Sequence, residues 1–498
     1  MSLDESTGAP ASTSGGESST SGGMPTSGGT TAVETPTSSG GSTGGSTSGD
    51  SSTTSSGTSS DDTTGAPIDI EEALAGIDGL TWVEVESEIP GYRYFDMKLR
   101  TPADHDDPDG QQFDLHVMLL HRDAAAPMVI ATEGYDIDWY VDNQSIALSQ
   151  PAALLQANEL IVEHRFFADS RPEPADWGLL TIEQAAADHH HVTSKFKSAI
   201  YGGPWVATGI SKGGMTAVYF RRFYPDDVVA TVAYVAPLHL GLADPRYWPF
   251  VEAVHPPCTA AMLEVRRELL LRREAMVERI EDHALMQGYD FTQFDPEHAL
   301  EITALQLPWS YYQYNWSLLC PADVPTAIST DLQLWDFMQA VRPIETLADE
   351  YVLPLEPYYW QAAVQVGNPA PGDEPLADLL KFPGFNSPAS YIVPGPGKLP
   401  VFDPGAMQDI AAWVSDEATA MLFVYGEIDP WTAGAYPENP EHDVHRLVVA
   451  GGRHGADIAE LSAVDRAFAY ERLEAWTGVT PIAGAVPIRP AREQLGLP

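Results

Sequence analysis

Four short apolar runs alternate with helix-like stretches in the first half of this chain, and this rhythm constrains the fold more than any other feature. The runs are PMVIATEGY, ELIVEHRFF, PWVATGI and VVATVAYVAP. Short, continuously apolar strands that are separated by helices predict a parallel sheet, because both faces of such a sheet must be covered. The sequence therefore predicts an α/β fold with helices on both faces of a mostly parallel sheet.

Three earlier stretches, TWVEVESEI, YRYFDMKLR and FDLHVMLLHR, alternate polar and apolar residues and predict antiparallel strands. The strand–helix rhythm stops at His239 and returns after Asp403 with the strands of AMLFVYGEIDPW and VHRLVVAGG and a closing helix. Between them, TAAMLEVRRELLLRREAMVERIEDHALMQG predicts one long amphipathic helix. We therefore expect a sheet domain in two parts, 67–238 and 404–498, with a helical cap inserted at 239–403.

Residues 1–66 are mostly Ser, Thr and Gly, a composition that predicts a flexible linker with little to bury. The start of the chain lacks the basic and apolar regions of a signal peptide, and we interpret it as a chain from which any export signal or anchor was removed. Tethers of this composition are typical of lipid-anchored bacterial surface proteins. We therefore expect a secreted or cell-surface protein, with a lipid or surface tether lost from the sequence.

The 498 residues carry a formal net charge of −45. This excludes a general nucleic-acid binder, which needs a basic face, and favours cationic ligands such as the free amino terminus of a peptide. No apolar run is long enough to span a membrane. The two cysteines, Cys258 and Cys320, either form a disulfide in an oxidising compartment or stay as buried thiols, and the sequence leaves both possibilities open. The oligomeric state is also left open by the sequence.

The stretch GISKG places Ser211 between Gly209 and Gly213, after an apolar strand and before a helix. A serine on such a sharp turn can present its hydroxyl above a sheet as a nucleophile, and the glycines allow strand and helix to approach closely. The pattern alone is weak, because short matches occur by chance. The strand before it and the helix after it strengthen the interpretation.

A serine nucleophile needs a base and an orienting carboxylate, which α/β-hydrolases carry in the chain order Ser, Asp or Glu, His. Asp429 follows one late predicted strand and His454 follows the next. Glu427 is a rival acid, while His442 and His445 lie at the wrong end of their strand. We therefore predict Ser211, Asp429 and His454 as the catalytic residues.

The oxyanion that forms during acyl transfer needs two backbone N–H groups. We predict one from Lys212 and the other from Gly134 or Tyr135, in the loop after an early strand. The Lys212 side chain itself is expected to be solvated or paired with an acid. The run His189 to His191 is no metal site, because adjacent helical residues point in different directions. We predict no metal and no cofactor.

The stretch GISKGGMTAVYFRRFYPDDVVATVAYVAPL closely resembles the nucleophile region of the secreted prolyl tri/tetrapeptidyl aminopeptidases, peptidase family S37. VEHRFFADSRP and LPWSYYQYNWSLLCP also resemble the related S28 family of Pro-X carboxypeptidases and dipeptidyl peptidases. The resemblance covers about residues 80 to 480. It implies an α/β-hydrolase fold with a helical cap, the roles given above for Ser211, Asp429 and His454, and cleavage after proline near the free amino terminus of a short peptide.

Substrate contacts are predicted from chemistry. An aromatic slot suits a proline ring, and the aromatic stretch of the cap offers Trp309 and Tyr312, with Tyr311, Tyr314 and Trp316 as further members. Glu133 and Glu163 end predicted strands, where open α/β sheets bind ligands, and either carboxylate would suit a substrate ammonium. The alternative for each glutamate is a structural ion pair.

Two other functions remain open at this stage. An esterase or lipase would use the same three residues, although an acidic, aromatic-lined site under a cap argues mildly against it. A catalytically dead, surface-tethered binding protein would not need an intact Ser, Asp and His set. The serine exopeptidase is the function that the sequence favours.

Overall fold

The computed structural model describes residues 68–138, 146–315, 317–393 and 401–484. The predicted linker at 1–66 and Trp316 therefore lie outside the described residues, and the linker stays a prediction. None of the described helices is long and apolar enough to cross a bilayer.

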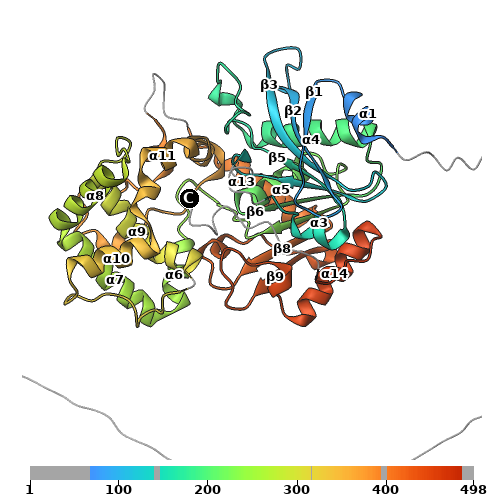
Figure 1. The fold of residues 1–498 in the computed structure, drawn as a ribbon. Helices are drawn as coiled ribbons and strands as arrows, with labels where there is room; N and C mark the ends of the chain where they lie inside the picture. The colour runs from blue at the N-terminus through green and yellow to red at the C-terminus, as the bar shows by residue number, and fades with distance from the viewer. Residues whose placement is uncertain (1–67, 139–145, 316, 394–400, 485–498) are drawn as a thin grey trace, which may run out of the picture. The chain divides into compact units, whose positions relative to one another are not determined.

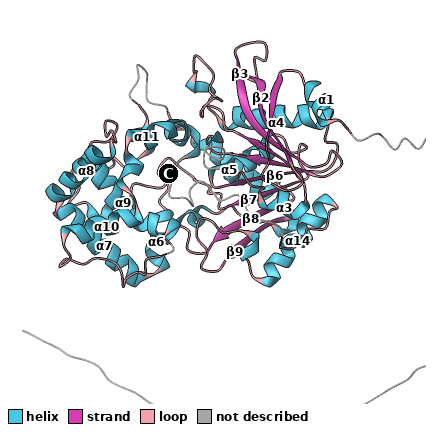
Figure 2. Cartoon of the chain, viewed as in Figure 1, coloured by secondary structure: helices cyan, strands magenta, loops and turns pink. Residues whose placement is uncertain are grey.

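A nine-stranded sheet runs through the described structure in the order β1-β2-β3-β5-β4-β6-β7-β8-β9. Figure 2 shows the strands in magenta. The first three strands and the β3–β5 pair are antiparallel, and every pair from β5 through β9 is parallel. The strands are β1 (Leu80–Val85), β2 (Arg93–Pro102), β3 (Gln112–His121), β4 (Met128–Thr132), β5 (Asn158–Val162), β6 (Trp205–Ile210), β7 (Ala230–Tyr234), β8 (Met421–Gly426) and β9 (Val444–Val449). The predicted antiparallel start and parallel body of the sheet are confirmed.

Helices cover both faces of this sheet (Figure 1). One face packs against α1, α4, α5 and α13, and the other against α3 and α14. Their bounds are α1 (Ile70–Ala75), α3 (Gln150–Leu155), α4 (Ile182–Ala199), α5 (Lys212–Phe223), α13 (Pro404–Asp416) and α14 (Ala463–Thr477). Because both faces are covered, every residue of β4, β5 and β7 is buried, which explains why these strands are apolar without alternation.

The described residues between β7 and α13 form helices joined by turns, and they gather to one side of the sheet around a hydrophobic core of their own (Figure 1). The helices are α6 (Tyr247–Val254), α7 (Pro256–Leu271), α8 (Arg273–Gln287), α9 (Pro296–Tyr314), α10 (Asp331–Val341), α11 (Asp349–Val352) and α12 (Glu356–Gln361). We call this part the helical segment. Its boundaries as a separate cap domain stay a prediction.

The single long helix predicted over 259–288 is wrong, because the chain breaks at Arg272 into α7 and α8. The Arg272 guanidinium donates to the Ser329 carbonyl at 2.7 Å and to the Asp331 carboxylate at 3.0 Å. These bonds tie the break to the start of α10. The amphipathic pattern runs through both helices, so periodicity alone does not reveal a one-residue interruption.

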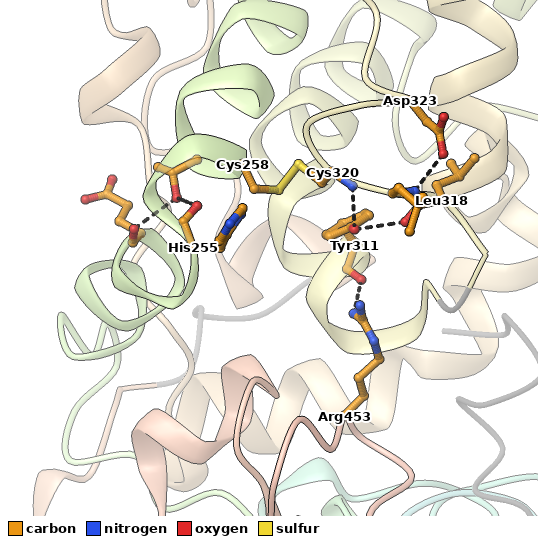
Figure 3. The surroundings of a disulfide bond; sticks show 10 residues. His255, Cys258, Tyr311, Leu318, Cys320, Asp323 and Arg453 are labelled. Atoms are coloured by element: carbon orange, nitrogen blue, oxygen red, sulfur yellow. Dashed lines mark hydrogen bonds between the residues drawn. A yellow bond between two sulfur atoms is a disulfide. The ribbon is translucent and has the colours of Figure 1, made fainter.

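A disulfide joins Cys258 on α7 to Cys320, in the turn that follows α9 (Figure 3). The structure thus contains the bonded form of the two alternatives that the sequence left open. Nearby, the Tyr311 hydroxyl donates to the Leu318 carbonyl at 2.9 Å and accepts from the Cys320 N–H at 3.2 Å. The disulfide and these bonds hold the end of α9 in place.

Candidate active site

Ser211 lies on the turn between β6 and α5, with φ 52° and ψ −123°. Few residues other than glycine adopt such angles, which cost about 1–3 kcal/mol and are found mainly where function requires them. The turn is tight, because a Cβ on Gly209 would lie 2.3 Å from the Gly213 carbonyl carbon. The Ser211 N–H donates to the Tyr234 carbonyl on the neighbouring strand at 2.9 Å. These features form the predicted strand–turn–helix elbow.

Asp429 follows β8 and His454 follows β9, and both side chains are fully buried. The imidazole Nδ1 lies 2.7 Å from the Asp429 Oδ2. The other Asp429 oxygen accepts from the Trp431 N–H at 3.2 Å, so the carboxylate is fixed in place. The rival Glu427 is exposed and accepts from the Gly451 N–H instead. The structure therefore brings the predicted acid and histidine together at the carboxyl ends of parallel strands.

The other histidines weighed in the sequence lie elsewhere. His445 contacts Asp443 at 2.8 Å. Adjacent members of the 189–191 run make separate contacts, such as His189 with the Ala185 carbonyl and His190 with Asp227. Within the described residues, the run therefore does not converge on one point.

A cavity opens between the elbow and the helical segment. Ser211, Lys212 and Tyr135 line it from the sheet side, and Trp248, Trp309 and Trp431 form an aromatic wall. The Trp309 and Trp431 ring centroids lie 4.9 Å apart, and those of Trp248 and Trp309 lie 5.8 Å apart. Among the described residues that line this cavity there is no carboxylate.

His454 adjoins the same cavity, because two lining rings contact its imidazole. The ring centroid of Trp431 lies 6.0 Å from that of His454, and the Tyr314 ring lies 6.2 Å from it. The backbone N–H of His454 also donates to the Gln313 carbonyl near the end of α9. The imidazole therefore packs against two of the rings that line the cavity together with Ser211.

The loop after β4 lies directly against the elbow. A Cβ on Gly134 would lie 2.6 Å from the Lys212 Cβ, and one on Gly213 would lie 2.5 Å from the Thr132 carbonyl oxygen. Lys212 is the first residue of α5, and the first N–H groups of a helix have no acceptor within that helix. Two backbone segments with N–H groups thus meet beside Ser211, as the oxyanion prediction requires.

The expectation for the Lys212 side chain is wrong. The residue is 3% exposed, and its amine makes no hydrogen bond within the described part of the chain. Its Nζ lies 5.9 Å from the centre of the Phe167 ring. Burial holds the pKa of the Lys212 ammonium well below its usual value. The side chain is neither solvated nor paired, because its stem packs against Gly134 and directs the amine inward.

Of the two aromatic residues predicted to contact substrate, Trp309 lines the cavity. Tyr312 is 3% exposed, packs edge-on against Tyr311 at 5.3 Å and is not among the cavity-lining residues. On a helix, residues three apart share a face only approximately, so the aromatic stretch of α9 divides between the cavity and the core.

Glu133 and Glu163 do not line the cavity with Ser211. Glu133 is half-buried at the end of β4. Glu163 is fully buried and accepts from the Ile137 N–H at 3.0 Å and the Ser170 N–H at 3.1 Å. Burial raises the pKa of Glu163 to about 7. Glu163 therefore fixes the backbone around it. This favours a structural role for Glu163 over binding of a substrate ammonium.

Sequence reasoning missed several cavity residues, among them Arg342, Gln306 and Trp248. All three belong to the helical segment, where no motif marks a binding residue. The wall residue Trp431 is different, because it stands two positions after Asp429 in a stretch already singled out. That proximity is the one signal that would have found it.

A mostly parallel sheet with a serine elbow after β6 and an Asp–His pair after the last two strands defines an α/β-hydrolase. A family model described as PS-10 peptidase S37 matches residues 64–492. The chain belongs to the peptidase S37 family and is a serine peptidase, and the resemblance noted in the sequence is confirmed.

Individual relatives in sequence are consistent with this family. The prolyl tri/tetrapeptidyl aminopeptidase of Streptomyces mobaraensis is 39% identical over 428 residues, which cover 84% of this chain and 87% of that protein. The lysosomal Pro-X carboxypeptidase of Homo sapiens is 33% identical over 137 residues, or 26% of this chain and 25% of that one. A solved proline iminopeptidase of Mycobacterium smegmatis is 14% identical, with a TM-score of 0.33, over 76% of this chain and 98% of its own. A structural likeness this weak carries no argument.

Proposed function

We propose that this protein is a serine exopeptidase that cleaves after proline near the free amino terminus of short peptides. The observation that carries the proposal is the buried Asp429–His454 pair, 2.7 Å apart, whose imidazole packs against Trp431 and Tyr314, two rings that line the cavity together with Ser211. The name of the Streptomyces mobaraensis relative supports the choice of peptide bond. No metal is required for this reaction.

In this mechanism the Ser211 Oγ attacks the carbonyl carbon of the proline residue. His454 donates its Nδ1–H to Asp429, which leaves Nε2 to accept the serine proton and pass it to the leaving amine. The N–H of Lys212 and that of Gly134 or Tyr135 stabilise the oxyanion. Water activated by His454 then hydrolyses the acyl-enzyme, and Ser211 regains its proton.

The aromatic wall supports the preference for proline. A proline residue is a compact apolar ring without an N–H, and it packs well against the faces and edges of indoles. Trp309 and Trp431 of the aromatic wall line the same cavity as Ser211. We therefore propose this wall, rather than Tyr312, as the proline site. The helical segment forms part of the cavity, which favours short peptides over folded proteins.

Recognition of the substrate ammonium has three candidate sources. Gln306 and Gln313 line the cavity, both come from α9, and each carries a neutral amide oxygen that can accept from an ammonium. Glu133 remains a candidate because it ends β4 next to the Gly134 turn. The strongly negative net charge of the chain also favours a cationic peptide end.

One observation favours a second candidate function, a Pro-X carboxypeptidase. Arg342 lines the cavity, and its Nη1 donates to the Ser310 hydroxyl at 3.3 Å. A guanidinium is suited to bind a substrate carboxylate through two parallel hydrogen bonds. If Arg342 binds the carboxyl end of a peptide, the enzyme removes residues from that end instead.

Secretion is part of the proposal. The disulfide between Cys258 and Cys320 supports it, because such bonds persist mainly in oxidising compartments outside the cytosol. The Ser/Thr/Gly tract at the start of the chain suits a tether to a surface.

The test is an assay of Ala-Ala-Pro-p-nitroanilide with a free and with an acetylated amino terminus. We expect cleavage of the free peptide, loss of at least tenfold in kcat/KM on acetylation, and a fall in kcat on the order of 10⁴-fold or more for Ser211→Ala. Ser194→Ala, an exposed serine on α4, is the matched control and should retain activity.

Other outcomes identify the rivals. Cleavage of a blocked Pro-X dipeptide, lost in Arg342→Gln, supports the carboxypeptidase. Turnover of p-nitrophenyl esters without peptide cleavage supports an esterase. Binding of peptides without turnover indicates an inactive binding protein.

A further inference from the structure

A second group of chemically reactive side chains lies outside the catalytic cavity, around His116 on β3. The residue is 4% exposed, and three carboxylates surround its imidazole. The Nε2 lies 2.6 Å from the Asp96 Oδ1, while the Nδ1 lies 3.2 Å from the Asp138 Oδ1 and 3.9 Å from the Glu163 Oε1. Neither serine chemistry nor the proline site uses this cluster.

The two ring nitrogens of His116 differ in their surroundings. The Nε2 makes a short hydrogen bond to Asp96, and the Nδ1 forms none, although two carboxylate oxygens face it. A neutral ring that donates its Nε2–H to Asp96 presents an Nδ1 lone pair to those oxygens. Lone pairs that face one another repel unless a cation lies between them.

The arrangement matches that of a metal ligand set. Metal-binding imidazoles usually donate their other N–H to a carboxylate, which fixes the ring. Here Asp96 is the carboxylate that accepts from the His116 Nε2–H. Ligand atoms that bind one Zn²⁺ at about 2.1 Å in tetrahedral geometry lie about 3.4 Å apart. The Nδ1 of His116 and the oxygens of Asp138 and Glu163 all lie within 4.8 Å of one another, and two of their separations bracket the ideal value.

Glu163 is prepared for this role by its backbone contacts. Its Oε1 accepts from the Ile137 N–H and its Oε2 from the Ser170 N–H, so the carboxylate is held in one orientation. Asp138 has half of its side chain exposed and lines a cavity of about 540 Å³. Of the three ligands only Asp138 lines that cavity, so we infer that an ion and a water molecule as the fourth ligand would reach the site from there.

We propose that His116 Nδ1, Asp138 and Glu163 bind one divalent transition-metal ion of the Zn²⁺ class, with Asp96 orienting the imidazole. One nitrogen and two carboxylate oxygens suit Zn²⁺ or Mn²⁺ better than Ca²⁺, which prefers oxygen ligands throughout. The ion would join β3, the end of β5 and the loop that follows β4. Its role is structural, because the catalytic steps proceed without it.

The test is calorimetric titration of the full chain with Zn²⁺ after EDTA treatment and dialysis. We expect one saturable site per chain, and a visible absorption band when Co²⁺ replaces Zn²⁺. Asp138→Asn should weaken the binding at least tenfold. Asp136→Asn, which removes an equal charge from the same cavity, should change it less than twofold.

His116→Gln should abolish the site, and circular dichroism checks that this buried variant folds. If it does not fold, the half-exposed Asp138→Asn variant carries the test alone. The absence of binding up to about 1 mM Zn²⁺, or equal affinity in wild type and Asp138→Asn, would overturn the proposal. Those results would mean that a proton on Nδ1, rather than a metal, neutralises the cluster.

Discussion

Lys212 is the residue whose position in the structure differs most from its expected role. It stands beside the nucleophile, yet its amine is buried and makes no hydrogen bond within the described residues. A buried ammonium is costly, so the folded state favours the neutral amine. In the mechanism proposed here the main-chain N–H of Lys212 is an oxyanion donor, while its side chain packs against Gly134.

This burial predicts a dependence of stability on pH. The folded-state pKa of Lys212 lies well below its unfolded value near 10.5, so the unfolded chain binds more protons between those two values. The unfolding free energy should therefore rise with pH across that window, by up to about 1.4 kcal/mol per pH unit.

Lys212→Met keeps the backbone N–H and removes the amine. Urea denaturation at pH 7, 8 and 9 should show a more stable variant whose stability rises less steeply with pH than that of the wild type. Equal slopes for the two proteins would contradict the buried neutral amine. The activity of the variant should remain within about tenfold of the wild type, because its oxyanion donor is unchanged.

At the scale of elements, the end of α9 and the turn that carries His454 are tied together. The Arg453 Nη1 donates to the carbonyls of Tyr311 at 2.6 Å and Tyr312 at 2.8 Å, the first of which Figure 3 shows. A cation that binds carbonyl groups at the end of a helix also interacts favourably with the helix dipole. The helical segment thus helps to orient the imidazole as well as to form the cavity.

Arg453→Met should therefore lower kcat/KM for the proline peptide by about 10- to 100-fold, since hydrogen bonds to a charged group contribute about 1.5–3 kcal/mol. Steady-state kinetics measure this. Arg446→Met is the matched control, because Arg446 lies on β9, where it forms a loose pair with Glu438 at 3.7 Å and a long hydrogen bond to the Tyr436 carbonyl at 3.4 Å. Similar losses in both variants would show that the effect is not specific to the α9 contact.

The disulfide joins α7 to the turn after α9. It closes a loop between positions 62 residues apart, and the chain-entropy model assigns such a bond about 4 kcal/mol of stability. The double variant Cys258→Ala with Cys320→Ala should lose about that much unfolding free energy in urea titrations. Wild type treated with a reductant should match it, whereas an unchanged midpoint would show that the bond adds no stability.

At the scale of the whole molecule, the net charge of −45 should steer substrates. Raising the ionic strength from about 0.05 M to about 0.5 M shortens the range of this field. We expect kcat/KM for Lys-Ala-Pro-p-nitroanilide to fall several-fold and that for Glu-Ala-Pro-p-nitroanilide to rise. Parallel changes for both peptides would indicate that the net charge does not affect association.

The order of strands and helices and the Asp–His pair were predictable from sequence, because apolar runs and chain order report them directly. The positions of Lys212 and Tyr312 were not, since each depends on packing against residues that are distant in sequence or on the far side of a helix. The break at Arg272 depends on bonds to residues near 330 that periodicity does not register. The His116 cluster was missed because its members come from separate strands and a loop, with no common spacing.

The sheet order also has a consequence for when the enzyme becomes active. Ser211 lies in the middle of the chain, whereas Asp429 and His454 follow the last two strands, which join the sheet only after the helical segment. With the roles proposed here, a partly synthesised or partly refolded chain already has its nucleophile but lacks the base. Such a chain does not hydrolyse the peptides and unfolded proteins around it. Hydrolysis therefore begins only when the sheet is complete.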